Sequence, residues 1–234
     1  MQDQTAELDW TEGAVPVSRR FGDAYYSLQG GLEETRWVFM AGNGLPTRFR
    51  DGFRIAETGF GTGLNLLVTW AAWVRAGAPG RLHYTTFEAF PMAPEDRCRA
   101  LAVWPELTPQ VTRLNFALER GQSDLGDGVI LDVVPGDVRA TLPVWHGQVD
   151  AWYLDGFSPA RNPAMWCDAV LAEVALRLVP GGTLATYTAA GHVRRALAAA
   201  GLEVTRCPGY GRKRHMTLAR KPSDSPPESP RDAQ

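Results

Sequence analysis

The chain has 234 residues, 44% of them hydrophobic, and a formal net charge of −2 at pH 7. This length predicts about one domain, and the near-neutral charge excludes a broadly basic nucleic-acid-binding protein, so any such contact must come from a local patch. The polar start, MQDQTAELDW, is no signal peptide, and no apolar run reaches membrane-spanning length. We therefore expect a cytoplasmic protein with no membrane partner.

The cysteines and histidines give no sign of a metal site. Cys98, Cys167 and Cys207 are far apart and form no CxxC pair, and the four histidines are scattered. This usage argues against a disulfide framework and against a cysteine zinc site, and it fits a reducing compartment. We expect no metal.

Residues 1–52 form the first of three expected segments. They do not follow the strand–helix alternation of the later chain, and they contain aromatic stretches such as Tyr25-Tyr26-Ser27. We expect a cap of short strands and a helix beside the mouth of a sheet, with either a substrate-binding or a merely stabilising role. Residues 53–220 are expected to form the main domain. Residues 221–234, KPSDSPPESPRDAQ, are expected to be a disordered tail.

From Phe53 onward, apolar strand candidates alternate with helix candidates. The expected strands are 53–57, 82–88, 129–134, 149–155, 181–187, 202–207 and 214–220, and the expected helices are 63–76, 94–103, 137–142, 163–178 and 189–200. This alternation predicts an α/β fold, a mostly parallel sheet with helices on both faces. Pro180-Gly181-Gly182 is expected to end a helix and start a strand.

The last two expected strands have only the tight linker 208–211 between them. They are therefore expected to pair as an antiparallel hairpin at the sheet edge. Seven strands ending in such a hairpin resemble the Rossmann-like layout of class I methyltransferases, which use S-adenosylmethionine.

The stretch ETGFGTG, residues 57–63, lies between the first of these strands and a helix. Its glycines are Gly59, Gly61 and Gly63, preceded by Glu57, whereas the NAD fingerprint would need a glycine at Leu64. The pattern is typical of methyltransferases. Glycines there let the backbone approach the sulfonium and ribose of S-adenosylmethionine, and Glu57 can meet its cationic amino end, directly or through water. The alternative is an ordinary tight turn.

Acidic residues follow the next three strands. Glu88 is placed to accept hydrogen bonds from ribose hydroxyls, and Asp137 to accept from the adenine amino group. The alternatives are a surface carboxylate for Glu88 and a helix cap for Asp137. Because parallel strands end at the same edge of a sheet, these groups and Asp155 should meet in one ligand crevice.

The stretch DGFSPARNPAMW, residues 155–166, follows the fourth strand. A carboxylate at Asp155 beside the ring of Phe157 suits an amine acceptor, because the carboxylate takes an N–H while the ring packs on the methylene. We expect these two residues to be catalytic. Asp155 would chiefly orient the amine, with proton acceptance second and a purely capping role as the alternative.

Longer motifs resemble one family specifically. ETGFGTGLN, LDGFSPARNPAMW, GGTLATYTAAGHVRRAL and GYGRKRHM are similar to the methyltransferase domain of MnmC, as are the stretches 14–18, 23–27 and 31–36. The resemblance covers about residues 8–220. It implies methylation of the 5-aminomethyl group of a wobble uridine in tRNA, often 2-thiolated, with S-adenosylmethionine as donor. It also implies that Tyr26, Ser27 and Glu34 help to build the cofactor site, and Asn65, in the first motif, is counted with them.

The chain departs from the bifunctional members of this family. They carry a second, FAD-dependent oxidoreductase domain, and no second glycine-rich fold follows here. The chain resembles a stand-alone form, so the aminomethyl precursor is expected to be made elsewhere, by enzymes that are potential partners.

A basic rim is the expected tRNA contact, with an aromatic side chain available for stacking. Its members are Arg161, Arg194, Tyr210, Arg212, Lys213 and Arg214. The alternative is a solvated run of surface charge. Three other functions remain open: a methyltransferase for a small-molecule or protein amine, a protein that holds S-adenosylmethionine without turnover, and an aminopropyl transferase. A nicotinamide oxidoreductase is disfavoured by Leu64.

Overall fold

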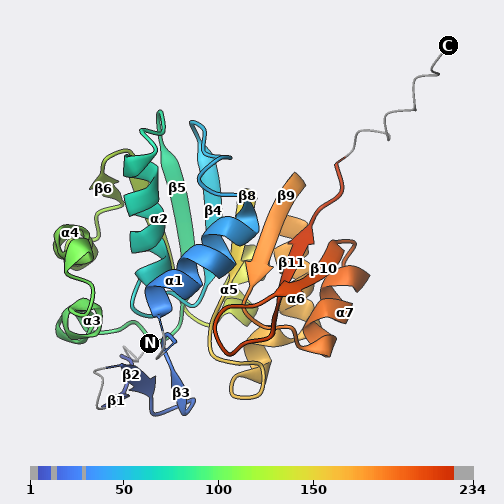
Figure 1. Ribbon diagram of the computed structural model, residues 1–234, viewed down its shortest axis with the longest axis horizontal. Helices are drawn as coiled ribbons and strands as arrows, with labels where there is room; N and C mark the ends of the chain where they lie inside the picture. The colour runs from blue at the N-terminus through green and yellow to red at the C-terminus, as the bar shows by residue number, and fades with distance from the viewer. Residues whose placement is uncertain (1–4, 12–14, 28–29, 224–234) are drawn as a thin grey trace.

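The computed structural model describes residues 5–11, 15–27 and 30–223. Ala14, at the start of one motif, and the greater part of the expected tail, 224–234, lie outside the described residues. A large sheet with helices on both faces forms the body of the molecule, and a small sheet lies beyond one of its ends (Figure 1). The described part of the chain contains no helix long and apolar enough to cross a membrane.

The large sheet has a parallel centre and antiparallel edges. Its spatial order is β10-β11-β9-β8-β4-β5-β7-β6. The parallel strands are β4 (Phe53–Thr58), β5 (Leu82–Glu88), β7 (Val129–Pro135), β8 (Val149–Leu154) and β9 (Leu178–Thr186). The antiparallel ones are β6 (Asp124–Gly126), β10 (Glu203–Pro208) and β11 (His215–Arg220). The chain leaves β4 in one direction for β5 and β7 and returns to β8 on its other side, which makes the β4–β8 junction the crevice of the sheet.

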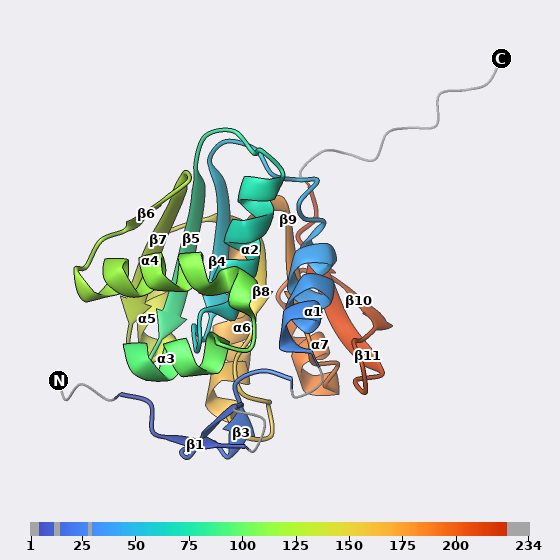
Figure 2. The same ribbon diagram turned by 60° about the vertical axis from the view of Figure 1, so that its left-hand side comes forward.

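Helices cover both faces, as the alternation predicted (Figures 1 and 2). One face carries α2 (Leu64–Arg75), α3 (Pro94–Leu101), α4 (Thr108–Glu119) and the helical segment that begins with α1 (Gly31–Thr35). The other carries α5 (Val138–Val144), α6 (Asp168–Arg177) and α7 (Gly191–Ala199). Side chains alternate between the two cores: Ile55 packs into the first, and its neighbour Ala56 into the second. All residues of β8 are buried, as a central parallel strand requires.

The N-terminal segment supplies the expected short strands and helix. Strands β1 (Leu8–Trp10), β2 (Pro16–Ser18) and β3 (Asp23–Ala24) form a three-stranded antiparallel sheet. Figures 1 and 2 place it beyond the carboxyl ends of the parallel strands. After α1 the chain continues through a π-helical turn (Arg36–Met40) and a 3-10 turn (Ala41–Asn43).

Three details differ from the sequence-based expectations. The large sheet has an eighth strand, β6, and helix α4 precedes it; neither was predicted, because β6 is only three residues long and α4 has a weak apolar pattern. Pro180-Gly181-Gly182 does not begin the strand. The helix ends at Arg177, and these residues form a bulge inside β9, with Gly181 at φ +75°.

Candidate active site

A cavity of about 1240 Å³ opens at the carboxyl ends of β4, β5, β7 and β8. It gathers most of the residues that the sequence singled out for cofactor or chemistry: Tyr26, Ser27, Glu34, Gly59, Gly61, Asn65, Glu88, Asp137, Asp155 and Phe157. Lys213, expected on the rim, also lines it. Seven candidates do not: Glu57, Gly63, Arg161, Arg194, Tyr210, Arg212 and Arg214.

The glycine turn forms one wall because its backbone needs conformations and spaces that only glycine allows. Gly59 and Gly61 have φ of +79° and +54°. A Cβ on Gly59 would lie 3.3 Å from the Cα of Gly156, so the turns after β4 and β8 touch each other. A Cβ on Gly61 would lie 3.0 Å from the Tyr25 ring. The turn therefore presents bare backbone to the cavity. Gly63 lies behind this surface, at the start of α2.

Glu88 is held by the same turn. Its Oε2 accepts a hydrogen bond from the Gly61 N–H at 2.9 Å, and its Oε1 accepts one from the Phe90 N–H at 2.7 Å. Each oxygen keeps a further lone pair, so the carboxylate can accept hydroxyl groups from a ligand in the cavity. The two backbone bonds fix its orientation.

Asp137 caps a helix, the alternative that the sequence left open, and its adenine role stays a prediction. Its side chain caps α5 by accepting the Arg139 N–H at 2.9 Å, and it lines the cavity as well. Hydrogen bonds from the Arg139 side chain lower the pKa of Asp137. The carboxylate is therefore ionised and already paired.

Glu57 lies beneath the cavity. Its side chain is fully buried, and it accepts hydrogen bonds from Asn65 Nδ2 at 2.8 Å and from Thr86 Oγ1 at 3.0 Å. Burial, followed by the charge of Asp155, raises the pKa of Glu57 well above its usual range. The Glu57 side chain does not line the cavity, and its expected contact with a cationic ligand, directly or through water, stays a prediction.

Asn65 joins two carboxyl groups. Its amide also donates to Asp155 Oδ2 at 2.7 Å, so both of its hydrogens are used, and its Oδ1 accepts from Thr35 Oγ1 at 2.9 Å. The side chain is thus fixed from β4, from the loop after β8 and from α1. Through its hydrogen bond to Oδ2, Asn65 helps to hold the Asp155 carboxylate in position.

Asp155 is the ionisable group at the crevice. Its Oδ1 accepts the Gly156 N–H at 2.8 Å. Burial raises the pKa of Asp155 to about 6, although hydrogen bonds from Gly156 and Asn65 and the charge of Lys213 oppose the rise. The carboxylate is therefore a fixed acceptor that changes charge close to neutral pH.

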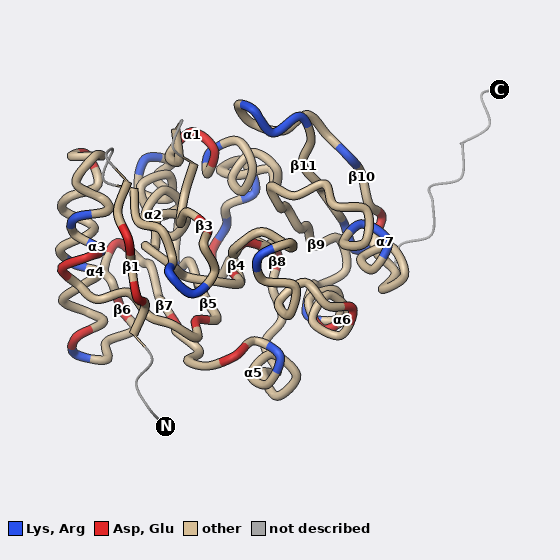
Figure 3. Tube along the Cα trace, turned by 90° about the horizontal axis from the view of Figure 1, so that it is seen from below, with Lys and Arg blue, Asp and Glu red and all other residues tan. Residues whose placement is uncertain are grey.

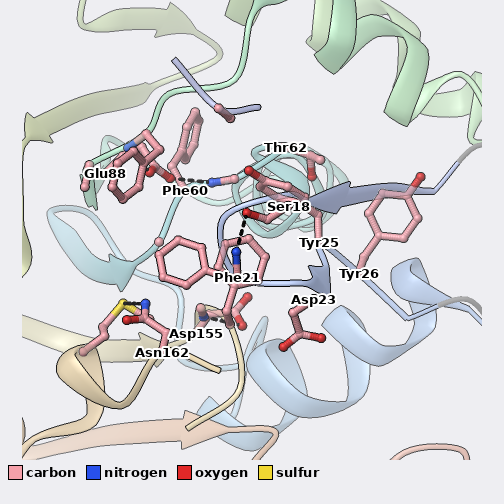
Figure 4. A pocket seen from close by; sticks show the side chains of 18 of the residues that line it. Ser18, Phe21, Asp23, Tyr25, Tyr26, Phe60, Thr62, Glu88, Asp155 and Asn162 are labelled. Carbon is pink, nitrogen blue, oxygen red and sulfur yellow. Dashed lines mark hydrogen bonds between the residues drawn. The ribbon is translucent and has the colours of Figure 1, made fainter. Parts of the chain in front are cut away.

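An aromatic wall faces Asp155, and most of it was missed by sequence reasoning. The Phe157 ring stacks on Phe21, with centroids 4.8 Å apart, and meets the edge of Tyr25 at 5.0 Å. Figure 4 shows Phe21 and Tyr25, from the β2–β3 segment, reaching into the cavity between Glu88 and Asp155. Buried Trp166 donates its indole N–H to the Phe157 carbonyl at 2.8 Å. The sequence predicted that the N-terminal segment lies beside the mouth of the sheet, but not that Phe21 and Tyr25 form this wall.

The N-terminal segment is tied to the loop after β8. Asp23 Oδ2 accepts the Ser158 N–H at 2.9 Å, and a Cβ on Gly22 would lie 3.7 Å from the Arg161 guanidinium. The two segments are more than 130 residues apart in the chain, so no local pattern could have revealed this contact. Together they close one side of the cavity.

Lys213 points inward rather than outward. Its Nζ lies 2.7 Å from Glu34 Oε1 and 4.1 Å from the centroid of the Tyr187 ring. Tyr187, also missed by sequence reasoning, follows β9 and donates its hydroxyl to the Gly156 carbonyl at 2.8 Å. An ammonium, a carboxylate and an aromatic face thus meet close to Asp155.

The remaining rim candidates do not line the cavity. Arg161, Arg212 and Arg214 are exposed, and Figure 3 shows basic stretches in the β10–β11 connection and beside the ends of β8 and α7. Arg194 lies in α7 and donates to the Ala189 carbonyl at 3.3 Å. Tyr210 is partly buried in the core, and its hydroxyl is 3.0 Å from the place where a Cβ on Gly30 would be, so it does not stand free as a stacking platform.

The cavity suits a nucleoside attached to an amino acid. It has a glycine backbone wall and a fixed carboxylate for ribose hydroxyls, and it is large enough for such a ligand. Residues 100–222 match the model of a family described as S-adenosyl-L-methionine-dependent methyltransferase. Because the match covers more than half of the chain, the protein belongs to this family, and its cofactor is S-adenosyl-L-methionine.

More specific similarities point the same way. The tRNA 5-methylaminomethyl-2-thiouridine biosynthesis bifunctional protein MnmC of Stutzerimonas stutzeri is 47% identical over 225 residues, which cover 91% of this chain and 34% of the relative. That of Caulobacter vibrioides is 47% identical over 94% of this chain and 39% of its own length. The chain spans about a third of the length of these curated relatives. The crystal structure of MNMC2 from Aquifex aeolicus superposes with a TM-score of 0.73 and 26% identity, covering 97% of this chain and 74% of the other.

Proposed function

We propose that this protein transfers a methyl group from S-adenosylmethionine to the amine of 5-aminomethyl-(2-thio)uridine at the wobble position of tRNA. The observation that carries the reaction type is the Asp155 carboxylate, which is fixed by hydrogen bonds from Gly156 and Asn65 and lines the same cavity as the glycine turn and Phe157. The substrate is supported by the tRNA-modifying relatives, which match over 91% of the chain. The product would be 5-methylaminomethyl-(2-thio)uridine.

Each part of the cavity has a proposed role toward the cofactor. Gly59 and Gly61 let the backbone approach the ligand, Glu88 accepts its ribose hydroxyls, and Asp137 receives the adenine amino group. Tyr26, Ser27 and Glu34 enclose the remaining part. Residues 53–220 would form the catalytic domain, and residues 1–52 a cap that completes the site.

The chemistry requires an uncharged amine in line with the donor. When bound, S-adenosylmethionine supplies a methyl group on a sulfonium, and its sulfur keeps the electron pair of the S–C bond that breaks as the N–C bond forms. Asp155 accepts an N–H of the acceptor and aims the nitrogen lone pair at the methyl carbon. The ring of Phe157 packs on the acceptor methylene. The proton that nitrogen loses leaves to Asp155 or to water.

Orientation is the larger contribution of these residues. An alkyl amine has a pKa near ~10, so freeing its lone pair at pH 7 costs roughly 4 kcal/mol. An ionised Asp155 adds to this cost because it favours the ammonium. Holding the reactants in line supplies on the order of 7–11 kcal/mol, which outweighs deprotonation. Asp155 is therefore proposed chiefly as an orienting group.

The tRNA would lie across the cavity mouth. Arg161, Arg194, Arg212 and Arg214 would contact its phosphates, in the cytoplasm where tRNA is modified. The reaction consumes an aminomethyl uridine, so an enzyme that makes this group must act earlier, and contact with such an enzyme is part of the proposal. The alternative acceptor is a small-molecule or protein amine.

The test uses methyl-labelled S-adenosylmethionine and tRNA that carries 5-aminomethyluridine, with unmodified tRNA as the control. Digestion and nucleoside chromatography locate the label. We expect it in 5-methylaminomethyluridine alone. If no label is transferred while calorimetry shows normal cofactor binding, the proposed substrate is wrong, and the small-molecule and protein amines become the acceptors to try.

A further inference from the structure

Lys213 is a cation placed inside a group of acids. It belongs to the connection between β10 and β11, yet its Nζ reaches Glu34 of α1 at 2.7 Å. The Glu34 side chain is only 10% exposed, whereas that of Lys213 is 43% exposed. Glu34 Oε1 has no hydrogen-bond donor aligned on it within the described residues, so the ammonium is its main compensation. The pair is therefore held by charge.

Apart from that of Lys213, the charges that act on Asp155 and Tyr187 beside this pair are, within the described residues, those of carboxylates. Asp155, after β8, feels the charges of both Lys213 and Glu34. Tyr187, after β9, lies under the ammonium. Burial raises the pKa of Tyr187, and the charges of Asp155, Asp23 and Glu34 add to the rise. Glu57 of β4 lies behind Asn65, and burial favours its neutral form. Without Lys213, the carboxyl groups of Glu34 and Asp155 would lie near each other with no cation between them.

We propose that Lys213 neutralises Glu34, so that the negative charge of Glu34 does not add to that of Asp155 at the acceptor amine and the amine becomes uncharged at a lower pH. The inference rests on the proposed amine acceptor. Lys213 would act through its electrostatic effect on the reacting nitrogen, without touching the substrate. It would not be part of the tRNA rim.

The sign of the effect follows from the charges. Removal of the Lys213 ammonium leaves Glu34 uncompensated, and a nearby negative charge favours the protonated form of both a carboxyl and an amine. The pKa of Asp155 and that of the bound acceptor should therefore both rise. Because Lys213 is partly exposed, we expect rises of about half a unit to one unit.

The first experiment needs no turnover. Carbon-13 NMR of the aspartate carboxyls follows the titration of Asp155, whose signal is assigned by its loss in Asp155→Asn. In Lys213→Met the midpoint should rise by about half a unit to one unit, and in the double variant Lys213→Met/Glu34→Gln it should return toward the parent value. Arg206→Met is the matched control, because it removes one cation from the exposed side of β10 in the same hairpin.

The second experiment measures the single-turnover rate of methyl transfer against pH, with tRNA and cofactor both saturating. In Lys213→Met, the part of the pH–rate curve where the rate rises should shift to higher pH by about half a unit to one unit, and the rate should reach the parent value in alkaline solution. Lys213→Arg should keep the parent pH–rate curve. A tRNA-binding role would instead raise KM for tRNA and leave the pH–rate curve in place. Lys213→Gln replaces the Met variant if that one folds poorly.

The results separate this inference from the proposed function. If Lys213→Met leaves both the Asp155 midpoint and the pH–rate curve unchanged, the inference is wrong, even with tRNA methylated as proposed. If the parent methylates no aminomethyl tRNA but the Asp155 midpoint still moves, the proposed substrate fails and the electrostatic role of Lys213 stands.

Discussion

At the scale of single residues, the site is organised around Asn65. One primary amide supplies a hydrogen bond to a fully buried carboxyl, Glu57, and another to the cavity carboxyl, Asp155. A side chain with both donors committed in this way cannot turn without leaving a buried acceptor unpaired. The orientation of Asp155 is therefore set before any ligand arrives, which is what an orienting role requires.

Asp155→Asn should retain cofactor binding but lower the single-turnover rate by about 10²-fold at pH 8. Because burial raises the pKa of Asp155 to about 6, the parent should lose activity with a steeper pH slope below that value, where the carboxyl as well as the acceptor amine takes up a proton. In the variant, only protonation of the acceptor amine should lower the rate, so its pH–rate curve should have the shallower slope. Rates measured from pH 5 to 9 check this, and an unchanged rate would remove Asp155 from the mechanism.

The same substitution should change stability in the opposite direction. The pKa of folded Asp155 lies above the ordinary value of ~3.9, so the fold favours the protonated form, and this stabilisation is lost as the pH rises from about 4 through about 6. Asp155→Asn should therefore raise Tm relative to the parent at pH 8 and lose this advantage near pH 4. Thermal melts at the two pH values provide the comparison.

Gly61→Val should weaken cofactor binding by about 100-fold, since both the positive φ and the Tyr25 ring oppose a side chain there. Gly77→Val is a matched control, because Gly77 has φ +57° against +54° for Gly61 but nothing within 4 Å of its added Cβ. Calorimetry with S-adenosylhomocysteine compares the two. Equal affinities would show that the glycine turn does not hold the cofactor.

At the scale of elements, the site depends on how β8 sits beside β4. Asp150 of β8, with its side chain only 5% exposed, accepts the Arg54 N–H at 2.9 Å and pairs with Arg50 at 2.7 Å. Four residues further along β8, the chain reaches Leu154 and then Asp155. A polar anchor near the start of the strand thus fixes the register that delivers the carboxylate at its end.

Asp150→Ala should lower the free energy of unfolding by about 2 kcal/mol, equivalent to a fall in Tm of about 4–8 °C for a chain of this size. This loss of stability is smaller than that expected for a fully buried ion pair, because the Arg50 side chain is 58% exposed and water screens its charge. Asp9→Ala breaks an ion pair in which both side chains are more than half exposed, and its Tm should not change measurably. Equal effects of the two substitutions in thermal melts would contradict the anchoring role.

At the scale of the whole molecule, the placement of charged residues matters more than the small net charge. The net charge is −2, yet Arg161, Arg212 and Arg214 are exposed, and Figure 3 shows a basic stretch in the β10–β11 connection. The cavity opens at the carboxyl ends of the parallel strands, and its interior is lined by several carboxylates. A polyanion would therefore be attracted to the rim, while a cationic group would be drawn inside.

The double variant Arg212→Gln/Arg214→Gln should weaken tRNA binding and reduce the slope of log affinity against log salt by about 2. Arg75→Gln, at the far end of α2 from the glycine turn, is the control that removes an arginine away from the rim, and it should leave the slope unchanged. Binding titrations between low and physiological salt give the slopes. The same slope in all three proteins would place the tRNA elsewhere.

The sequence determined the parts of this protein whose causes are local. Strand β5 has the predicted bounds, and β4, β8 and β11 lie within a residue of theirs, because long apolar runs bounded by turn residues specify strands directly. The glycine turn and the acids after consecutive strands were predicted for the same reason. In parallel strands, a shared edge follows from topology alone.

Tertiary structure alone decided the contacts between distant segments. Phe21 and Tyr25 come from a segment with no regular pattern, and they reach Phe157 only because Asp23 is tied to Ser158. Burial, which sequence does not show, placed Glu57 behind Asn65 and left Glu34 with little access to water, where the ammonium of Lys213 reaches it. In both cases a polar side chain excluded from water takes the partner that packing brings to it, however far away that partner lies in the chain.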